Sequence, residues 1–330
     1  MRPRRLLLCL VIAGVACSMP IERTVPAPAG FAIRQTPSRE PISPIQVSAD
    51  LDPARVALGS LLFRDPLLSH DNTVACASCH HLDLGGVDRL SHSVGIYGQV
   101  GGRNAPTVFN SGLNFRQFWD GRAATLEDQI DGPTAHPLEM GSNWPEITQK
   151  LNHSSEYAAT FTRLYGGATA ASVKDAIATF ERSLNTPNSR FDRFLTGDAA
   201  VLTTAEAQGY ADFKSFGCVS CHQGTNVGGN MFQRLGVVEP PPPASALMLD
   251  IGRFGVTADA RDQHVFRVPS LRNVAVTPPY FHDGSVTTLE GAVAIMGRYQ
   301  LGRQLTSDEI GRLVAFLKTL TGEYEGHVLQ

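Results

Sequence analysis

The chain has 330 residues, of which 42% are hydrophobic, so it can bury one large core or two of ordinary size, and its length favours two domains. The formal net charge is −3 and no long basic run is present, which argues against nucleic acid as a partner. Beyond the N-terminus no stretch approaches the roughly 18 consecutive apolar residues that a membrane-spanning helix needs.

The N-terminal segment is typical of an export signal. Three arginines precede an apolar run from Leu6 to Val15, and small residues follow, which predicts a signal peptide over residues 1–16 and a periplasmic protein. Cleavage before Cys17 would also suit a lipoprotein acylated at this cysteine, although the glycine three places before it is unusual there. A soluble protein and one tethered by a lipid anchor at Cys17 therefore both stay open. Residues 17–45 are expected to form an N-terminal extension.

The four cysteines that follow Cys17 lie in two motifs of the same pattern, CASCH at 76–80 and CVSCH at 218–222. A disulfide, a redox dithiol or a zinc site are the other interpretations of paired cysteines, but a histidine directly after both pairs favours covalent c-type haem. Two thiols can then bond the haem vinyl groups while the imidazole reaches the iron. The pattern predicts two haems, bound through Cys76, Cys79, Cys218 and Cys221, with His80 and His222 as axial ligands.

Further similarities between the two halves predict an internal duplication. The segment RNAPTVFN (103–110) is similar to RVPSLRN (267–273), and FWDGRAATLED (118–128) is similar to FHDGSVTTLEG (281–291). Segments repeated in the same order along a chain are typical of two copies of one domain.

In these similar segments, each residue of the first half is the same number of positions away from its counterpart in the second half. This separation is called the repeat spacing. It takes Pro106 to Pro269 and Asp120 to Asp283. The motif histidines are closer together than this spacing, so the second copy carries an insertion between its haem motif and the shared segments. The insertion includes VVEPPPPAS (237–245), which we expect to be a stiff loop.

Helical patterns dominate the rest of the chain. SVKDAIATFERSLNTP predicts a helix capped by Ser172 and ending before Pro187. TTAEAQGYADFKSFG has a capping box of Thr203 and Glu206, and TSDEIGRLVAFLKTLTG has the same arrangement. In the last segment Thr306 is the expected N-cap, Glu309 lies three residues on, and Gly322 is the stop.

No alternation typical of strands competes with these helices, so the fold class is expected to be all-α. It should consist of two cytochrome c-like haem domains related by internal duplication. The first domain is expected over residues 46–187 and the second over residues 188–330.

The function of each haem depends on the sixth ligand of its iron. A thioether or imidazole in the sixth position blocks the iron, whereas a vacant position admits a small molecule. In the second half the candidate is Met296, which ends the segment HDGSVTTLEGAVAIM that begins at His282, with Met231 and Met248 as alternatives or core residues. In the first half the repeat spacing places Pro133 at the position of Met296, and proline cannot bind iron. The two halves are therefore expected to differ, one closed and one open.

The residues expected around the first haem are polar, namely Gln129, His136 and Glu139. A carboxyl group above an open iron can carry a proton from the near to the far oxygen of bound peroxide. Glu139 is the candidate for that role, and the alternative is an ordinary surface glutamate. Met140 beside it is a rival axial ligand, which would close the site.

The chain resembles the bacterial di-haem cytochrome c peroxidases over nearly all of its mature length. The resemblance rests on the two haem motifs and on the segments GGRNAPTVFN, FWDGRAATLEDQIDGP, HPLEMG, FRVPSLRNVAVTPPYFHDGSVTTLEGAV and MGRYQLGRQL. The wider family includes the methylamine-utilisation di-haem enzymes, which oxidise tryptophans of a partner protein.

This resemblance implies roles for the residues that match. The first haem would be the low-potential peroxidatic centre, with Gln129 and Glu139 in its distal pocket, and the second would be the high-potential centre that accepts electrons, with Met296 as its sixth ligand. Trp119 would relay electrons between them or simply pack the interface. The donor would be a small c-type cytochrome or a copper protein (cupredoxin), the substrate hydrogen peroxide, and the enzyme a possible homodimer.

A calcium ion between the domains is also implied. Its ligands would lie at Asn104, Thr277 and Pro279, the last two through backbone carbonyls. Hard oxygen donors of this kind suit calcium.

One departure from the family concerns the peroxidatic iron. Many members place a histidine in an S-I-G-H stretch that caps this iron, whereas this chain reads SVGIYG, with Ile96 at that position. The first haem is then permanently five-coordinate, or His92 or Tyr97 has replaced the histidine.

The missing histidine points towards the methylamine-utilisation enzymes, but Met296 points away, because those enzymes use tyrosine there. We therefore expect a peroxidase. Long-range oxidation of a partner protein and a non-catalytic di-haem electron carrier are the alternatives.

Overall fold

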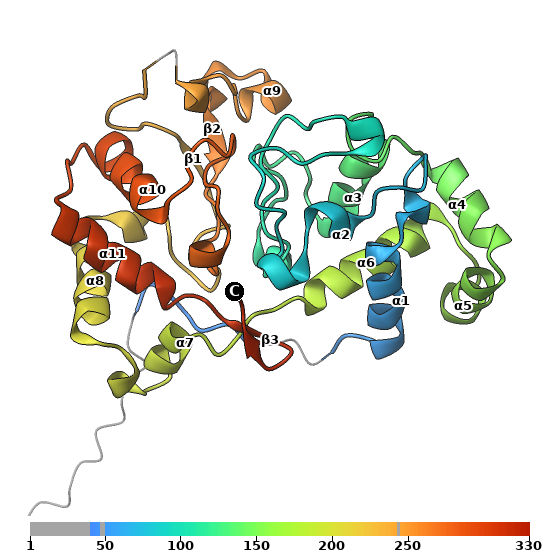
Figure 1. Ribbon diagram of the computed structural model, residues 1–330, viewed down its shortest axis with the longest axis horizontal. Coiled ribbons are helices and arrows are strands. Elements are labelled where there is room, and N and C mark those ends of the chain that lie inside the picture. The colour runs from blue at the N-terminus through green and yellow to red at the C-terminus, as the bar shows by residue number, and fades with distance from the viewer. Residues whose placement is uncertain (1–39, 47–49, 243–244) are drawn as a thin grey trace, which may run out of the picture. The chain divides into compact units, whose positions relative to one another are not determined.

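The computed structural model describes residues 40–46, 50–242 and 245–330 (Figure 1). The expected signal peptide, the lipid anchor at Cys17 and most of the N-terminal extension lie outside the described residues. Within the described ranges, none of the helices is long and apolar enough to cross a membrane.

In the first half the central contact is made by α1 (Pro53–Arg64) and α6 (Ala170–Ser183). Asp52 caps α1 by accepting a hydrogen bond from the Ala54 backbone N–H. The other helices of this half are α2 (Cys76–Cys79), α3 (Leu126–Ala135), α4 (Trp144–His153) and α5 (Ser155–Tyr165).

The predicted cap of α6 is wrong. The helix begins three residues earlier than expected, with Thr169 as N-cap, and Ser172 is the third helical residue of a capping box. The Ser172 hydroxyl accepts a hydrogen bond from the Thr169 backbone N–H, and the Thr169 hydroxyl accepts one from the Ser172 N–H. Both residues are good caps, and only the path of the chain decides between them.

In the second half α8 (Thr204–Ser215) packs against α11 (Ser307–Lys318). Both predicted capping boxes are confirmed, because Thr203 caps α8 with Glu206 and Thr306 caps α11 with Glu309. The remaining helices of this half are α7 (Arg190–Leu195), α9 (Phe254–Thr257) and α10 (Leu289–Ile295).

The sheet content of the described residues is small. Strand β1 (Phe232–Arg234) pairs antiparallel with β2 (Val265–Arg267), and β3 (Glu323–Tyr324) pairs antiparallel with β4 (His327–Val328). The helical fold class is confirmed.

The two main helix pairs cross at glycines. A Cβ atom added to Gly59 of α1 would overlap the Ala176 carbonyl of α6, and one added to Gly209 of α8 would overlap the Arg312 carbonyl of α11. Glycine therefore lets the two helix backbones approach closely at the crossing in each half, and Ala176 and Arg312 occupy the same place in the two crossings.

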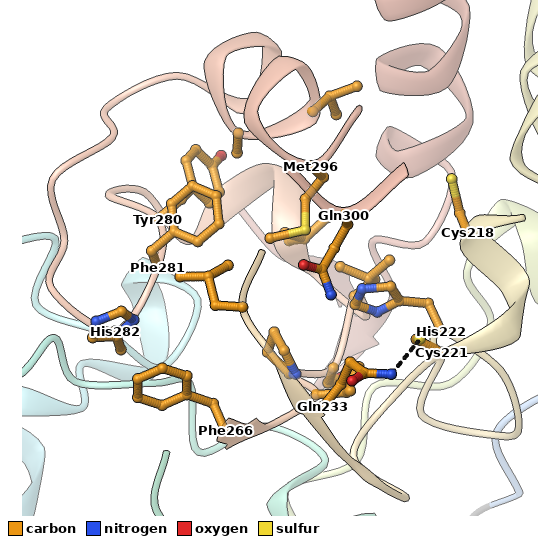
Figure 2. Close-up of a pocket in the computed structure, with 18 of the residues that line it drawn as sticks. Cys218, Cys221, His222, Gln233, Phe266, Tyr280, Phe281, His282, Met296 and Gln300 are labelled. Carbon is orange, nitrogen blue, oxygen red and sulfur yellow. Dashed lines mark hydrogen bonds between the residues drawn. The ribbon is translucent and has the colours of Figure 1, made fainter. Parts of the chain in front are cut away.

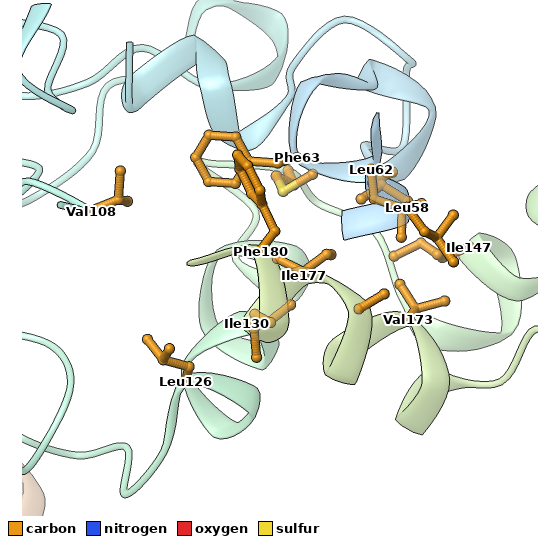
Figure 3. Packing of buried hydrophobic residues seen from close by; sticks show 14 of the residues in the cluster. Leu58, Leu62, Phe63, Val108, Leu126, Ile130, Ile147, Val173, Ile177 and Phe180 are labelled. Carbon is orange, nitrogen blue, oxygen red and sulfur yellow. The ribbon is translucent and has the colours of Figure 1, made fainter. Parts of the chain in front are cut away.

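Aromatic packing repeats beside these crossings. The ring centroids of Phe63 and Phe180 are 5.3 Å apart in the first half, and those of Phe213 and Phe316 are 5.0 Å apart in the second. Figure 3 shows α1 and α6 side chains meeting in the first core, including Leu58, Leu62, Phe63, Ile177 and Phe180. A separate core contains residues of α8 and α11.

The two halves meet through a reciprocal pair of backbone hydrogen bonds. The Asn104 N–H donates to the His282 carbonyl at 2.9 Å, and the Arg267 N–H donates to the Trp119 carbonyl at 2.7 Å. The repeat spacing takes Asn104 to Arg267 and Trp119 to His282. The N–H donor therefore comes from the same position in each half, and the carbonyl acceptor comes from the same second position in the other half.

Candidate functional site

The first haem motif lies at a cavity of about 690 Å³. Cys76 and Cys79 sit in the single turn of α2, and His80 ends that turn, with its N–H donating to the Cys76 carbonyl at 3.0 Å. The His80 Nδ1 lies 3.3 Å from the Gly86 carbonyl oxygen. With Nδ1 donating to this carbonyl, Nε2 is the nitrogen left for a metal ion.

The second motif is arranged in the same way at a cavity of about 580 Å³. Cys218 and Cys221 lie at a short 3₁₀ turn, and the His222 Nδ1 is 3.3 Å from the Val227 carbonyl oxygen. Burial lowers the pKa of His222 to about 4, so its imidazole stays neutral and suited to bind metal. Figure 2 shows Cys221 and His222 at this cavity, with Met296.

Haem fits the residues present. Both cavities fall within the roughly 300–1,000 Å³ typical of ligand sites, and the four motif cysteines are free thiols rather than disulfides. Arg267 lines both cavities, is 4% exposed, and has no hydrogen-bond partner for Nη1 among the described residues. Burial lowers the pKa of Arg267 to about 10. The carboxylates of a haem would supply the anion that this buried cation lacks.

Met296 follows α10 at the start of a five-residue π-helix, Met296–Gln300. Such irregular turns are frequent at functional sites. Its side chain lines the same cavity as His222, whereas neither Met231 nor Met248 is among the lining residues. The structure thus brings the predicted sixth ligand and the motif histidine to one cavity.

Pro133, Gln129, His136 and Glu139 all line the first cavity. The His136 Nδ1 lies 3.6 Å from a Glu139 carboxylate oxygen. Partial burial raises the pKa of Glu139 above its usual value, and the nearby His136 and Arg122 act in the opposite direction. This carboxyl group is therefore poised to exchange protons closer to neutral pH than an ordinary glutamate.

The loop that carries Ile96 presents no metal-binding side chain to the first cavity. Ile96 is 3% exposed and packs into the first core, with its N–H donating to the Glu139 carbonyl at 2.9 Å. Tyr97 is 68% exposed, and neither it nor His92 is among the residues that line the cavity. Met140 does line it, while its buried side chain also packs in the first core.

Trp119 lies between the two haem motifs, because it lines both cavities. Its Nε1 donates to the Asn104 carbonyl at 2.9 Å. Its ring is 6.3 Å from that of His282, which stacks on Phe266 at 4.2 Å. The sequence suggested Trp119 but not its aromatic neighbour, although the repeat spacing, which takes Trp119 to His282, could have indicated the pair.

The residues expected to bind calcium lie near one another. Asn104, Thr277 and Pro279 all line the second cavity, and the Asn104 side-chain amide donates to the Leu90 carbonyl at 2.9 Å. The calcium site itself stays a prediction.

An ion-pair group joins the halves beside the first cavity. The Arg103 guanidinium binds Asp120 of its own half and Asp250 of the other, at 2.5 and 2.6 Å. Burial acts to raise the pKa of Asp250, but hydrogen bonds from Arg103 and from the Gly252 N–H outweigh it and hold that pKa below its ordinary value.

Sequence reasoning missed two buried charged residues of the cavities. Arg267 lines both cavities, and Glu181 lines the first. A charged residue within an apolar helical stripe, as in ATFERS, is the signal that could have identified Glu181.

Known proteins similar to this chain include cytochrome c peroxidases and a MauG-like protein. The family described as di-haem cytochrome c peroxidase matches residues 53–200. The chain is 47% identical to cytochrome c peroxidase Ccp of Escherichia coli (strain K12) over 86% of its own length, and it spans 62% of that relative. It is 45% identical to the cytochrome c551 peroxidase of Nitrosomonas europaea, covering 87% of this chain and 85% of that protein. A crystal structure of a MauG-like protein associated with microbial copper homeostasis matches with a TM-score of 0.74 and 30% identity, covering 88% of this chain and 95% of that chain.

Proposed function

This chain belongs to the di-haem cytochrome c peroxidase family, and we propose that it reduces hydrogen peroxide to water with electrons from a small c-type cytochrome or a copper protein. One observation carries the proposal. The two cavities share a haem motif but differ opposite it, since Met296 lines the second and the acid–base residues Gln129 and Glu139 line the first.

Cys76, Cys79 and His80 would hold one haem, and Cys218, Cys221 and His222 the other. The bound haems supply iron that changes its charge by one electron at a time. Glu139 would accept a proton from one peroxide oxygen and return it to the other, so that water can leave. The Gln129 amide orients the peroxide, and these fixed polar groups supply most of the rate for so small a substrate.

Met296 would be an iron ligand of the haem in the second cavity, which would receive the donor's electrons. Trp119 would carry electrons between the two cavities, and its contact with both supports this role. The buried position of Ile96 supports a first iron that this loop does not cap, so that the enzyme needs no prior reduction. A calcium ion bound at Asn104, Thr277 and Pro279 would hold the two halves together.

The halves are proposed to be copies of one ancestral cytochrome c-like domain, over residues 46–187 and 188–330. The reciprocal hydrogen bonds of Asn104 and Arg267 and the paired glycine crossings support this origin. The arginine-rich leader supports export to the periplasm. Pairing of two chains is the further assembly we propose.

Oxidation of a partner protein, as in the methylamine-utilisation enzymes, is the second candidate. Ile96 in place of a capping histidine favours it, as does the similarity to a MauG-like protein. Met296 opposes it, since those enzymes use tyrosine there. A third interpretation, a plain electron carrier, is disfavoured by the acid–base residues of the first cavity.

The test is Glu139→Gln, which keeps the size of the side chain and removes its proton chemistry. Peroxide turnover should fall by about 10²–10⁴-fold, the usual contribution of a positioned acid–base group. The absorption spectra of both haems should stay unchanged. The matched control is Glu146→Gln on α4, a residue that lines neither cavity.

Retained turnover in Glu139→Gln would remove this residue from the mechanism. Electron paramagnetic resonance of the resting protein separates the alternatives. A peroxidase should contain a high-spin fraction that binds cyanide, whereas a carrier would contain two six-coordinate low-spin irons.

A further inference from the structure

The first cavity contains a second carboxyl group that the peroxidase chemistry above does not use. Glu181 lies near the C-terminal end of α6, is 6% exposed and lines the first cavity together with Cys76 and His80. Its Oε2 has no hydrogen-bond partner among the described residues. A buried carboxylate without a partner is costly, so this group is favoured in its neutral, protonated form.

The corresponding position of the second half carries no acid. Ala176 and Arg312 occupy matching places in the two helix crossings, and Phe180 and Phe316 occupy matching places in the two aromatic contacts. The two residues of each pair are separated by the same number of positions along the chain, an offset that differs from the repeat spacing. The same offset takes position 181 to Leu317, which is 5% exposed and lines the second cavity. One buried position beside each haem motif is therefore an acid in the first cavity and a leucine in the second.

The charged groups around Glu181 leave it without a direct ion pair. Arg182, the next residue of α6, acts to lower its pKa, but its guanidinium is bound to Glu127 of α3 at 2.7 Å. Glu127 itself acts in the opposite direction.

Several other charged residues on the packed helices are held in contacts of their own. Lys174 of α6 binds Asp131 of α3, and Arg55 of α1 binds Asp175 of α6. Arg64 of α1 lies over the ring of Phe180. Burial thus dominates and raises the pKa of Glu181 to about 8.

We propose that Glu181 is a proton-accepting group coupled to the first haem. Where the pH leaves it ionised, it binds one proton when an electron reaches that haem and releases the proton when the electron leaves. This inference rests on the proposed binding of haem in the first cavity. The electron comes from the redox-protein donor by way of the second haem, and the proton comes from water. On reduction the O–H bond of the Glu181 carboxyl group forms while an O–H bond of a solvent water breaks and leaves hydroxide in the solvent, and on oxidation both changes are reversed.

The physical reason is charge compensation. An electron added in a low-dielectric cavity repels a nearby carboxylate more strongly than it would in water. Reduction therefore favours the protonated form of Glu181, and by linkage the ionised form opposes reduction. At a pH well below the pKa of this carboxyl group the proton is already bound and the potential is independent of pH. Above that pKa, reduction must take up a proton, and the potential of the first haem falls as pH rises.

Spectroelectrochemical titration of the full-length holoprotein between pH 6 and pH 10 tests this coupling. For the unaltered protein we expect a flat region at low pH and a fall of up to about 59 mV per pH unit at and above about pH 8, one electron being coupled to one proton. The second haem, which has Leu317 at this position, should lack that fall.

Glu181→Gln should abolish the fall at the first haem, and Glu181→Leu, which introduces the residue of the second half, should do the same. Asp175→Asn is the matched control, because it removes a charge from the outer side of the same helix. It should preserve the fall. The glutamine variant keeps the side-chain size, so the test remains decisive if the leucine variant does not fold.

An unchanged pH dependence in Glu181→Gln would overturn the proposal, and so would loss of the dependence in Glu139→Gln but not in Glu181→Gln. Peroxide turnover measured separately distinguishes this failure from failure of the proposed function. A protein that retains the proton-coupled potential but lacks peroxide turnover would support Glu181 and contradict the peroxidase assignment.

Discussion

The two cavities share a local frame and differ in the side chains placed on it. Each has two cysteines and a histidine on one short turn, a histidine Nδ1 beside a backbone carbonyl, and a glycine at the crossing of its two main helices. At matched positions, however, the first cavity has Pro133 and Glu181 where the second has Met296 and Leu317.

This difference teaches that haem attachment and haem chemistry are separable. The motif and the helix crossing have the same arrangement in both halves. The residues at the matched positions differ in polarity instead, although Glu181 and Leu317 are both buried. Polar groups in the first cavity suit a reacting substrate, and apolar groups with one thioether suit electron transfer alone.

After Glu139→Gln, the largest effect on turnover should come from removing the thioether of the second cavity, in Met296→Leu. Loss of the proposed sulfur ligand should lower the potential of the second haem and slow electron delivery. Donor-driven peroxide turnover should fall at least about tenfold, which corresponds to about 1.4 kcal/mol in the activation barrier. Steady-state assays with a reduced cytochrome c and optical spectra would measure both changes.

Met248→Leu is the matched control, because Met248 does not line the second cavity. It should leave the spectrum and the turnover unchanged. A Met296→Leu protein with an unaltered second-haem spectrum would show that this methionine is not a ligand.

The next effect is on stability rather than turnover, and it should follow from disturbing the helix crossing of either half. Gly59→Ala and Gly209→Ala each introduce a Cβ atom that overlaps a backbone carbonyl. Each should reduce the free energy of unfolding by about 1–3 kcal/mol, as overpacking usually does. Thermal or denaturant unfolding of the holoprotein would measure the loss.

The exposed Gly311 in α11 provides the control, since an added Cβ meets nothing within 4 Å. Gly311→Ala should stabilise the protein by about 0.5–1 kcal/mol through helix propensity. If only one of the two buried substitutions destabilised the protein, the two crossings would not be energetically equivalent.

The smallest effect concerns the pH profile of the first cavity. Arg122 acts to lower the pKa of Glu139, and the repeat spacing takes Arg122 to Ser285 in the second half. Arg122→Ser should therefore raise the pKa of Glu139 further. In the proposed mechanism Glu139 must be ionised to accept a proton, so turnover should be lost as pH falls through this pKa, and the acid limb should move to higher pH. Turnover measured across the pH range would detect the shift, and an acid limb moved to lower pH would contradict it.

The sequence by itself determined the features that depend on neighbouring residues. The CASCH and CVSCH motifs, the capping boxes begun by Thr203 and Thr306, and the helical fold class all follow from short-range chemistry, and the helices and the class are confirmed. The cap of α6 could not be chosen in this way, because Thr169 and Ser172 are both good caps only three residues apart.

Only the tertiary structure decided which distant residues share a cavity. Trp119 and Arg267 line both cavities, and Glu181 lines the first, although their surroundings come from segments far apart in the chain. The sequence placed Ile96 at the position where many family members have a capping histidine. The neighbouring residues did not predict that Ile96 is buried in the first core. Helical periodicity indicates which face of an element turns inward. It does not specify what that face meets, since this depends on how the helices cross.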